Sequence, residues 1–425
     1  MGVERTGRQV GWSGGAWLAM FRGVRTMLPL AAAITVIGFV GSFTLPYIPL
    51  FLTSAVRADP VETAAFLIAG PLAGVALSTV AGRLSDRPGM RRVTLIVACL
   101  AGVAGFGAYA VTREYWLLLP VAVTLVALSS AAFPLTFAFA RHRLDQDTPG
   151  ESAAVVNALR MLVSVSWVAG PPIAAFVLDA VTFTGLFTIV AVGFAMAAGI
   201  VAVRLAEPGR PAAVLHDERS TSDSDGPRTT GGIPLAAGAF LMMQTAAMLS
   251  TIAMSLYVTG DLRGNVQQAG WILAVCAVLE IPLMLMLGAF ATRFPLHRLV
   301  MAGAAVGVAY FAVVAVATSP WHVAVAQILN AFFVAAVAGL GISYFQDLDP
   351  GHPGRATTIF VNTQRVSAMV AGAALGLAQH LGFRVAYAGG AVLCALGLAA
   401  LLVRHTQFRR RPSGRDRAAR LERAS

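Results

Sequence analysis

The stretch Gly82-Arg-Leu-Ser-Asp-Arg-Pro-Gly-Met-Arg-Arg92 joins two apolar runs, residues 61–82 and 93–111. Each run has about 20 residues, enough for a helix to cross the hydrocarbon core of a bilayer. Pro88 and Gly89 end the first helix and reverse the chain. The stretch therefore predicts a tight turn between two membrane-spanning helices, on one face of the membrane.

The side chains of this loop suit contacts with neighbouring helices. Gly82 permits a close approach between helices, because it has no Cβ. Asp86 lies near a helix end, where a carboxylate can bind an Arg or the N-terminus of another helix. Arg87, Arg91 and Arg92 are typical of a cytoplasmic loop.

The composition is that of a membrane protein. Of 425 residues, 57% are hydrophobic and 12% are charged, whereas soluble domains carry about 25% charged residues. Cys99, Cys276 and Cys394 lie in apolar runs, with a spacing that fits neither a metal site nor a disulfide framework. The net charge of +11 reflects Arg anchors at the membrane surface. We therefore expect no metal, no cofactor and no nucleic-acid partner.

The apolar runs number twelve, and the Arg residues between them set the orientation. Four of the 31 Arg fall in alternate loops, two lie inside runs, and the remaining 25 lie in the tails and the other loops. This asymmetry places both termini in the cytoplasm, and no cleavable signal peptide is apparent. The runs are residues 28–52, 61–82, 93–111, 115–140, 152–178, 184–204, 233–258, 267–290, 299–317, 321–345, 355–380 and 384–403.

The sequence indicates that the two halves of the chain are copies of one repeat. Asn157-x-x-Arg160 recurs as Asn362-x-x-Arg365, and the loop Gly82–Arg92 has a degenerate copy in Gly288–Arg298. Transporters built from repeats bind their substrate where the repeats meet. We expect a cytoplasmic segment 1–27, a six-helix bundle 28–205, a cytoplasmic linker 206–232, a second six-helix bundle 233–403 and a basic cytoplasmic tail 404–425.

Charged residues inside the runs are candidates for proton coupling. Every third run (3, 6, 9 and 12) lacks charges and amides in its interior and is suited to face lipid. Glu280 lies deep in run 8, where desolvation penalises the anion, which makes it a candidate proton carrier. Arg160 and Arg365 lie on equivalent runs and can compete with a proton for this carboxylate. A permanently paired Glu280, or Arg side chains that reach the surface, would be purely structural.

Neutral amides in the runs predict a pocket for an uncharged, hydroxyl-rich ligand. Such groups exchange hydrogen bonds with hydroxyls, and aromatic rings offer stacking faces. The structural alternative is that each amide joins two helices. The predicted substrate-binding residues are Gln244, Asn330, Gln327, Asn362, Asn157, Tyr47 and Trp167.

The ordered pattern G-x-L-x-D-R-x-G-x-R-R resembles the loop between helices 2 and 3 of the major facilitator superfamily. Leu279-Glu-Ile-Pro282 and Tyr344-Phe-Gln-Asp-Leu348 resemble blocks of its sugar efflux transporter family. The resemblance implies an all-α membrane protein with twelve transmembrane helices in two pseudo-symmetric six-helix bundles. It also implies export of sugars or glycosides in exchange for protons, with Glu280, Arg160, Asn362 and Arg365 at family positions. Asn157 departs from the small hydroxyl residue expected there. The implied conformational gating loop comprises Gly82, Asp86, Arg87, Gly89, Arg91 and Arg92.

The nearest alternative is a multidrug–proton antiporter on the same fold, because Met242, Met243, Met248 and Met254 are grouped on run 7. An enzyme is disfavoured, because no metal-ligand cluster, activated nucleophile or nucleotide loop is present. We expect a monomeric, multi-pass protein of the bacterial cytoplasmic membrane, with protons, the bilayer and a small sugar or glycoside as its partners.

Overall fold

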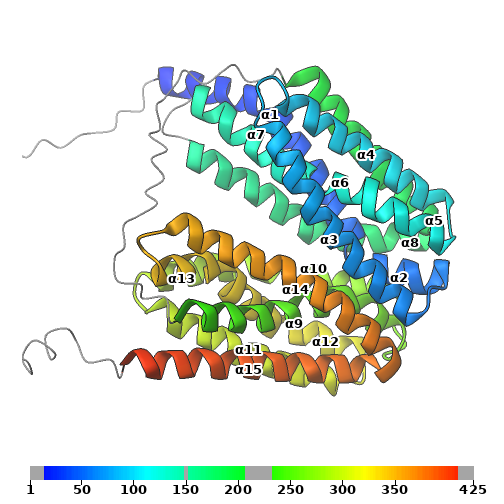
Figure 1. Ribbon diagram of the computed structural model, residues 1–425, viewed down its shortest axis with the longest axis vertical. Coiled ribbons are helices and arrows are strands. Elements are labelled where there is room, and N and C mark those ends of the chain that lie inside the picture. The colour runs from blue at the N-terminus through cyan, green and yellow to red at the C-terminus, as the bar shows by residue number, and fades with distance from the viewer. Residues whose placement is uncertain (1–13, 148–151, 206–231, 410–425) are drawn as a thin grey trace, which may run out of the picture.

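The computed structural model describes residues 14–147, 152–205 and 232–409, and in these ranges it consists of helices joined by short turns and loops (Figure 1). The N-terminal elements are α1 (Gly14–Thr44), α2 (Ile48–Leu50), a π-helical turn η1 (Phe51–Val56), α3 (Pro60–Ser85), α4 (Arg91–Val111), α5 (Tyr115–Val121), η2 (Ala122–Val126), α6 (Ala127–Ser129), α7 (Ala132–Asp147) and α8 (Ser152–Arg204). The C-terminal elements are α9 (Ile233–Thr259), α10 (Val266–Ala291), α11 (Leu296–Ala315), α12 (Pro320–Val334), η4 (Ala335–Gly339), α13 (Leu340–Leu348), α14 (Pro353–Leu381) and α15 (Phe383–Arg409).

These elements form the predicted number of spans. In the described ranges, nine helices and one bent pair are long and apolar enough to cross a membrane. α8 counts twice, because Thr182 has non-helical angles (φ 61°, ψ −174°) and breaks it between the predicted runs 5 and 6. α14 has the length of a span and carries polar residues in its interior. The nine helices and the bent pair give ten spans. Counting α8 twice and adding α14 brings the number to twelve, which confirms the predicted fold class.

Equivalent helices of the two halves begin with the same local chemistry. The Asp59 side chain accepts from the backbone N–H of Glu62, and the Glu62 side chain accepts from that of Asp59, which forms a capping box at the start of α3. Asn265 and Gln268 repeat this capping box at the start of α10. Arg57 and Arg263, two residues before each box, both adopt positive φ. These pairs are 206 positions apart, as are Gly82 and Gly288, so the duplication extends to the turns.

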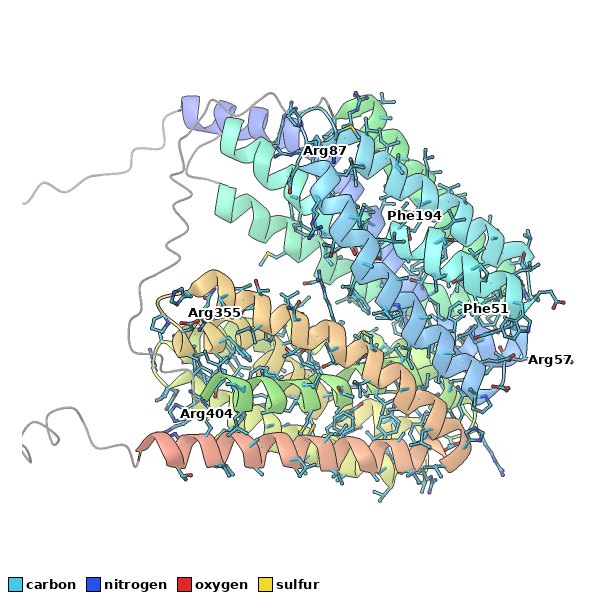
Figure 2. All side chains as sticks on the ribbon, viewed as in Figure 1. Phe51, Arg57, Arg87, Phe194, Arg355 and Arg404 are labelled. Atoms are coloured by element: carbon cyan, nitrogen blue, oxygen red, sulfur yellow. The ribbon has the colours of Figure 1, made fainter. Side chains whose placement is uncertain are left out.

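The two halves, α1–α8 and α9–α15, meet at one end of the molecule and diverge at the other (Figure 1). The start of α1 and the end of α15 lie at the diverging end. Arg355 and Arg404 also lie there, whereas Arg57 lies at the opposite end (Figure 2). α4 and α15 lie on the outer edges of their halves, as expected of the least polar runs.

Glycines seal the end at which the halves meet. A Cβ at Gly376 of α14 would lie 2.7 Å from the Pro60 carbonyl oxygen and 2.5 Å from the Ala64 Cβ of α3. A Cβ at Gly270 of α10 would lie 2.8 Å from the Pro171 carbonyl oxygen of α8. In a bilayer, such small residues let backbones pack closely, which supplies the attraction between helices.

Two hydrogen bonds also cross the seam at this end. Ser255 Oγ of α9 donates to the Pro46 carbonyl at 2.8 Å, and Gln267 Nε2 of α10 donates to Asp179 Oδ2 of α8 at 3.0 Å. The seam at this end is therefore a continuous contact between the halves.

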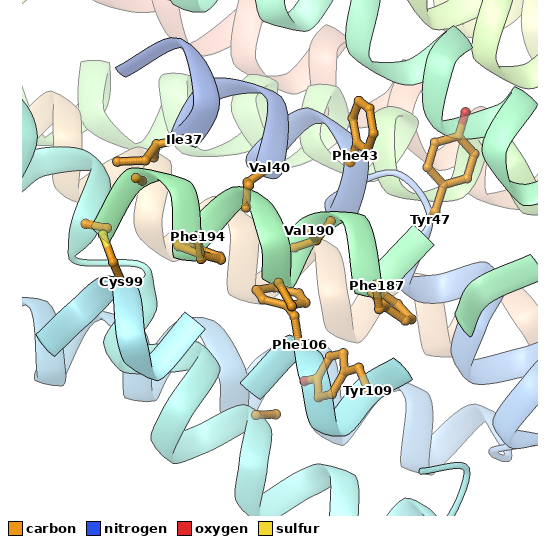
Figure 3. Close-up of a cluster of buried hydrophobic side chains, with 14 of the residues drawn as sticks. Ile37, Val40, Phe43, Tyr47, Cys99, Phe106, Tyr109, Phe187, Val190 and Phe194 are labelled. Atoms are coloured by element: carbon orange, nitrogen blue, oxygen red, sulfur yellow. The ribbon is translucent and has the colours of Figure 1, made fainter. Parts of the chain in front are cut away.

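Within the N-terminal half, stacked aromatic rings join α4 to the second span of α8 (Figure 3). The Phe106 and Phe194 rings stack with centroids 5.7 Å apart, and Phe187 packs against Tyr109. Gly102 leaves the space for the Phe194 ring, because a Cβ there would lie 2.5 Å from that ring. This half is therefore packed as one body.

Replacing Gly376 with Leu should lower the thermal unfolding midpoint of the purified protein. The new side chain collides with backbone and Cβ atoms of α3, and overpacking of this kind costs about 1–3 kcal/mol. Gly389 of α15 is exposed with no atom within 4 Å of a Cβ built on it, so Gly389→Leu is the matched control. Equal midpoints for both variants would contradict the close seam.

Candidate functional site

A cavity of about 750 Å³ lies between the two halves. The N-terminal half contributes side chains from α7 and α8, and the C-terminal half contributes side chains from α9, α10, α12, η4 and α14. The volume is in the range of small-molecule sites. The lining side chains used below are Phe133, Trp167, Gln244, Met248, Ser250, Met254, Cys276, Glu280, Met284, Asn330, Gln364 and Ser367.

Glu280 contributes the carboxylate among the described lining residues. It lies on α10 one helical turn from Cys276 and one from Met284, and all three line the cavity, because residues four apart share a helix face. Glu280 is partly buried and forms no ion pair with a residue that the structure describes. An acid inside a membrane-spanning bundle is costly and marks a functional position.

Two amides in the wall leave polar atoms available to a ligand. Gln244 is 7% exposed, and neither its Oε1 nor its Nε2 has a hydrogen-bond partner among the described residues. Asn330 is 9% exposed, and its Oδ1 also has none there. Leaving a buried polar group unsatisfied costs about 1–3 kcal/mol. These atoms are therefore suited to bind hydrogen-bonding groups of a solute in the cavity.

Gln327 is fully buried and does not line the cavity. Its Oε1 accepts from Asn330 Nδ2 at 2.8 Å, and its Nε2 lies 3.5 Å from the Tyr310 hydroxyl. The Tyr310 hydroxyl lies 2.8 Å from Ser250 Oγ, which borders the cavity. Sequence reasoning missed Tyr310, since run 9 carries no charge or amide in its interior, and it missed Ser250 of run 7, since it considered only charges, amides and aromatic rings. The signal available was the Tyr310 hydroxyl, because a buried tyrosine needs a partner.

The candidate residues of the N-terminal half do not all line the cavity. Trp167 lines the cavity. Tyr47 is fully buried outside the lining, and its hydroxyl donates to the Pro171 carbonyl at 2.8 Å. The side chains of Asn157 and Arg160 lie outside the described residues.

On α14, the side chains that line the cavity lie on a different helix face from the candidates. Asn362 and Arg365 are exposed and do not line it, whereas Gln364 and Ser367 do. Both pairs have the three-residue spacing of a helix face, so the spacing alone did not select between them. An offset of two residues turns the face by about 200°, so the lining face is nearly opposite the predicted one. Ser367 Oγ also donates to the Leu241 carbonyl at 3.0 Å, which fixes α14 against α9.

The loop after α3 binds within its own half. Arg92 donates to the Val201 carbonyl at 3.4 Å and to the Ala202 carbonyl at the end of α8, where a cation complements the helix dipole. Gly89 adopts φ 76°, as the turn requires. Asp86 and Arg87 are exposed.

The expected close helix approach at Gly82 is wrong for this conformation. A Cβ there would have no atom within 4 Å, because the halves diverge at this end of the molecule.

A helical bundle that crosses a membrane many times and encloses a cavity between two related halves is a membrane transporter. Comparisons with known proteins agree. The family model described as "Major Facilitator Superfamily" matches residues 30–231 and 235–424. The chain is 34% identical over 382 residues to a "Putative sugar efflux transporter" of Deinococcus radiodurans, covering 88% of this chain and 95% of that one. It is 32% identical to "Sugar efflux transporter A" of Dickeya chrysanthemi, covering 84% and 91%.

Solved structures share the fold. A crystal structure of the nucleoside transporter NupG superposes with a TM-score of 0.70 at 13% identity, over 91% of this chain and 100% of that one. A transporter of the POT family superposes with a TM-score of 0.72 at 12% identity, over 90% and 95%. The chain belongs to the major facilitator superfamily and, within it, to the sugar efflux transporter family. It is a multi-pass membrane transporter, not an enzyme.

Cys276 should react with a small thiol reagent such as methyl methanethiosulfonate much faster than the other two cysteines. It borders the cavity, whereas Cys99 and Cys394 are fully buried elsewhere. Peptide mass spectrometry of treated membranes measures the three modifications separately. The variant Cys276→Ser should take up almost no label, and preferential modification of Cys99 or Cys394 would contradict the placement of the cavity.

Proposed function

We propose that this protein exports sugars or glycosides across the bacterial cytoplasmic membrane in exchange for protons, by exposing the cavity to each side in turn. The observation that carries the proposal is the cavity at the seam, with a carboxylate in its wall and buried amide atoms that have no partner among the described residues. The names of the relatives, which are sugar efflux transporters at 30–34% identity, support the same substrate class.

The chemistry of the wall suits a neutral ligand with many hydroxyl groups. Gln244 offers both a donor and an acceptor, and Asn330 offers an acceptor, and hydroxyls satisfy both kinds of atom. No Arg or His is among the described residues that line the cavity, which disfavours an anionic ligand. Trp167 offers an apolar face against which a sugar ring or an aglycone can pack.

The proton-coupling group in this proposal is Glu280. The carboxylate lies in the cavity without an ion-pair partner among the described residues, so a proton can reach it from solvent. Arg160 and Arg365 remain the proposed competitors for the carboxylate. Arg365 directly follows Gln364, which lines the cavity, but is itself exposed outside the lining. Consecutive helix residues point about 100° apart, so this competition requires α14 to rotate towards the cavity.

We assign the diverging end to the cytoplasm, because the Arg-rich loops and tails predict that side. The cavity would then be in the conformation in which an exporter loads its substrate. The loop Gly82–Arg92 lies on the same side, and we propose that it forms the gate that closes this side in the opposite conformation.

A multidrug–proton antiporter is the second candidate, and one observation favours it. Met248, Met254 and Met284 line the cavity together with Phe133 and Trp167, and thioethers and aromatic rings suit apolar ligands. Met243 is fully buried, and neither it nor Met242 lines the cavity, so the Met group is smaller than the sequence indicates.

Replacing Glu280 with Gln should abolish sugar accumulation driven by a pH gradient in inverted vesicles, because an amide cannot take up or release a proton. Exchange of labelled for unlabelled sugar should continue, since it needs no net proton movement. Glu114→Gln is the matched control, because Glu114 lies in an exposed loop between α4 and α5. Gradient-driven accumulation that survives in Glu280→Gln would remove Glu280 from coupling.

Uptake of radiolabelled lactose, glucose and a lipophilic cationic drug into inverted vesicles tests the substrate class. We expect uptake of a sugar, reduced by Gln244→Leu, because that variant removes both unpartnered amide atoms from the wall. Movement of the drug alone would replace the proposal with the second candidate.

A further inference from the structure

A chain of hydrogen bonds begins and ends at the cavity and passes behind its wall. Its members are Asn330, Gln327, Tyr310 and Ser250, from α12, α11 and α9 of the C-terminal half. Asn330 and Ser250 border the cavity, whereas Gln327 and Tyr310 are fully buried behind them. The inner pair does not touch the space that a ligand would occupy, so any effect on a ligand must act through the outer pair.

The inner pair fixes which way the Asn330 amide faces. Gln327 Nε2 donates to the Val323 carbonyl at 3.4 Å and to the Tyr310 hydroxyl at 3.5 Å. A backbone carbonyl can only accept, so the NH₂ group of Gln327 faces Val323 and its Oε1 faces Asn330. Asn330 Nδ2 then donates to this Oε1 at 2.8 Å and to Cys276 Sγ at 3.3 Å.

These bonds use both hydrogens of the Asn330 amide. An amide nitrogen carries two hydrogens, and each has an acceptor inside the wall. The remaining atom, Oδ1, is buried without a partner among the described residues. Asn330 lines the cavity, and the hydrogen-bonding capacity that its amide has left is therefore that of an acceptor and not a donor.

We propose that Gln327 and Tyr310 are positioning residues that hold Asn330 as an acceptor-only group, so that the transporter requires a ligand hydroxyl that donates a hydrogen at this point. The inference rests on the proposed function, because it takes the cavity to be the sugar site. It adds a specificity rule, since an otherwise identical ligand with an acceptor and no donor at this position is rejected.

Deoxyfluoro sugars test the rule, because fluorine replaces a hydroxyl at similar size and can accept but cannot donate. In the unaltered protein, one ring position should exist at which the deoxyfluoro derivative loses roughly tenfold or more in kcat/KM against the parent sugar. At that position, kcat/KM for the deoxyfluoro derivative should not exceed kcat/KM for the deoxy derivative, because the fluorine and Asn330 Oδ1 are both acceptors.

Gln327→Met should relax this rule. Met fills a similar volume but no longer accepts from Asn330, so the Asn330 amide can turn and offer its NH₂ group to fluorine. In this variant, kcat/KM for the deoxyfluoro derivative should then exceed kcat/KM for the deoxy derivative. Tyr310→Phe removes one acceptor of the Gln327 amide. It should raise the ratio of kcat/KM for the deoxyfluoro derivative to kcat/KM for the deoxy derivative, by less than Gln327→Met does. Tyr257→Phe is the matched control, because its hydroxyl donates to the Val314 carbonyl outside this chain and its ratios should match the parent protein.

Transport of the parent sugars by the unaltered protein is measured first, which separates the two levels of the argument. Absence of any sugar transport would overturn the proposed function and this inference with it. Normal transport with no discriminating ring position, or with ratios unchanged in both Gln327→Met and Tyr310→Phe, would overturn this inference alone. A purely structural role for Gln327 would lower kcat/KM for all ligands by the same factor and leave the ratios unchanged.

Discussion

Inside a bilayer, every polar atom must find its partner within the protein, and this constraint organises the structure. Backbone groups meet it by forming helices. Side chains of the C-terminal half meet it through bonds such as those of Tyr257 and Ser367. Thr63, Tyr109 and Gln379 leave buried atoms without partners among the described residues, and so do Gln244 and Asn330; of these five, Gln244 and Asn330 line the cavity.

The seam shows how packing complements this polar constraint. At the end where the halves meet, Gly270 and Gly376 bring backbones together, and Ser255 and Gln267 add hydrogen bonds across the seam. At the other end, no atom lies within 4 Å of a Cβ built on Gly82. The stacked rings of Phe106 and Phe194 join α4 to the second span of α8 within the N-terminal half.

The sequence predicted features that depend on composition and local order. Twelve spans, the break near Thr182 and the turn at Gly89 follow from apolar length and from Gly and Pro chemistry. Glu280, Gln244 and Asn330 line the cavity, as expected of polar residues deep in a span, and Trp167 lines it beside them. Features that depend on helix rotation were not accessible. Gln364 and Asn362 lie two residues apart on α14, and only packing against α9 decides which of them faces inward. Tyr310 was missed because its role depends on contacts with two other helices.

The distribution of polar groups between the halves has a consequence for the proposed exposure of the cavity to each side in turn. Among the described lining residues, every amide and the carboxylate belong to the C-terminal half, whereas Phe133 and Trp167 come from the N-terminal half. Hydrogen bonds depend steeply on angle, while apolar contacts do not. A ligand held by the C-terminal half would therefore keep its hydrogen bonds while the N-terminal half moves relative to it. Loading and release would then exchange mainly non-directional contacts, which favours a low barrier for the loaded carrier.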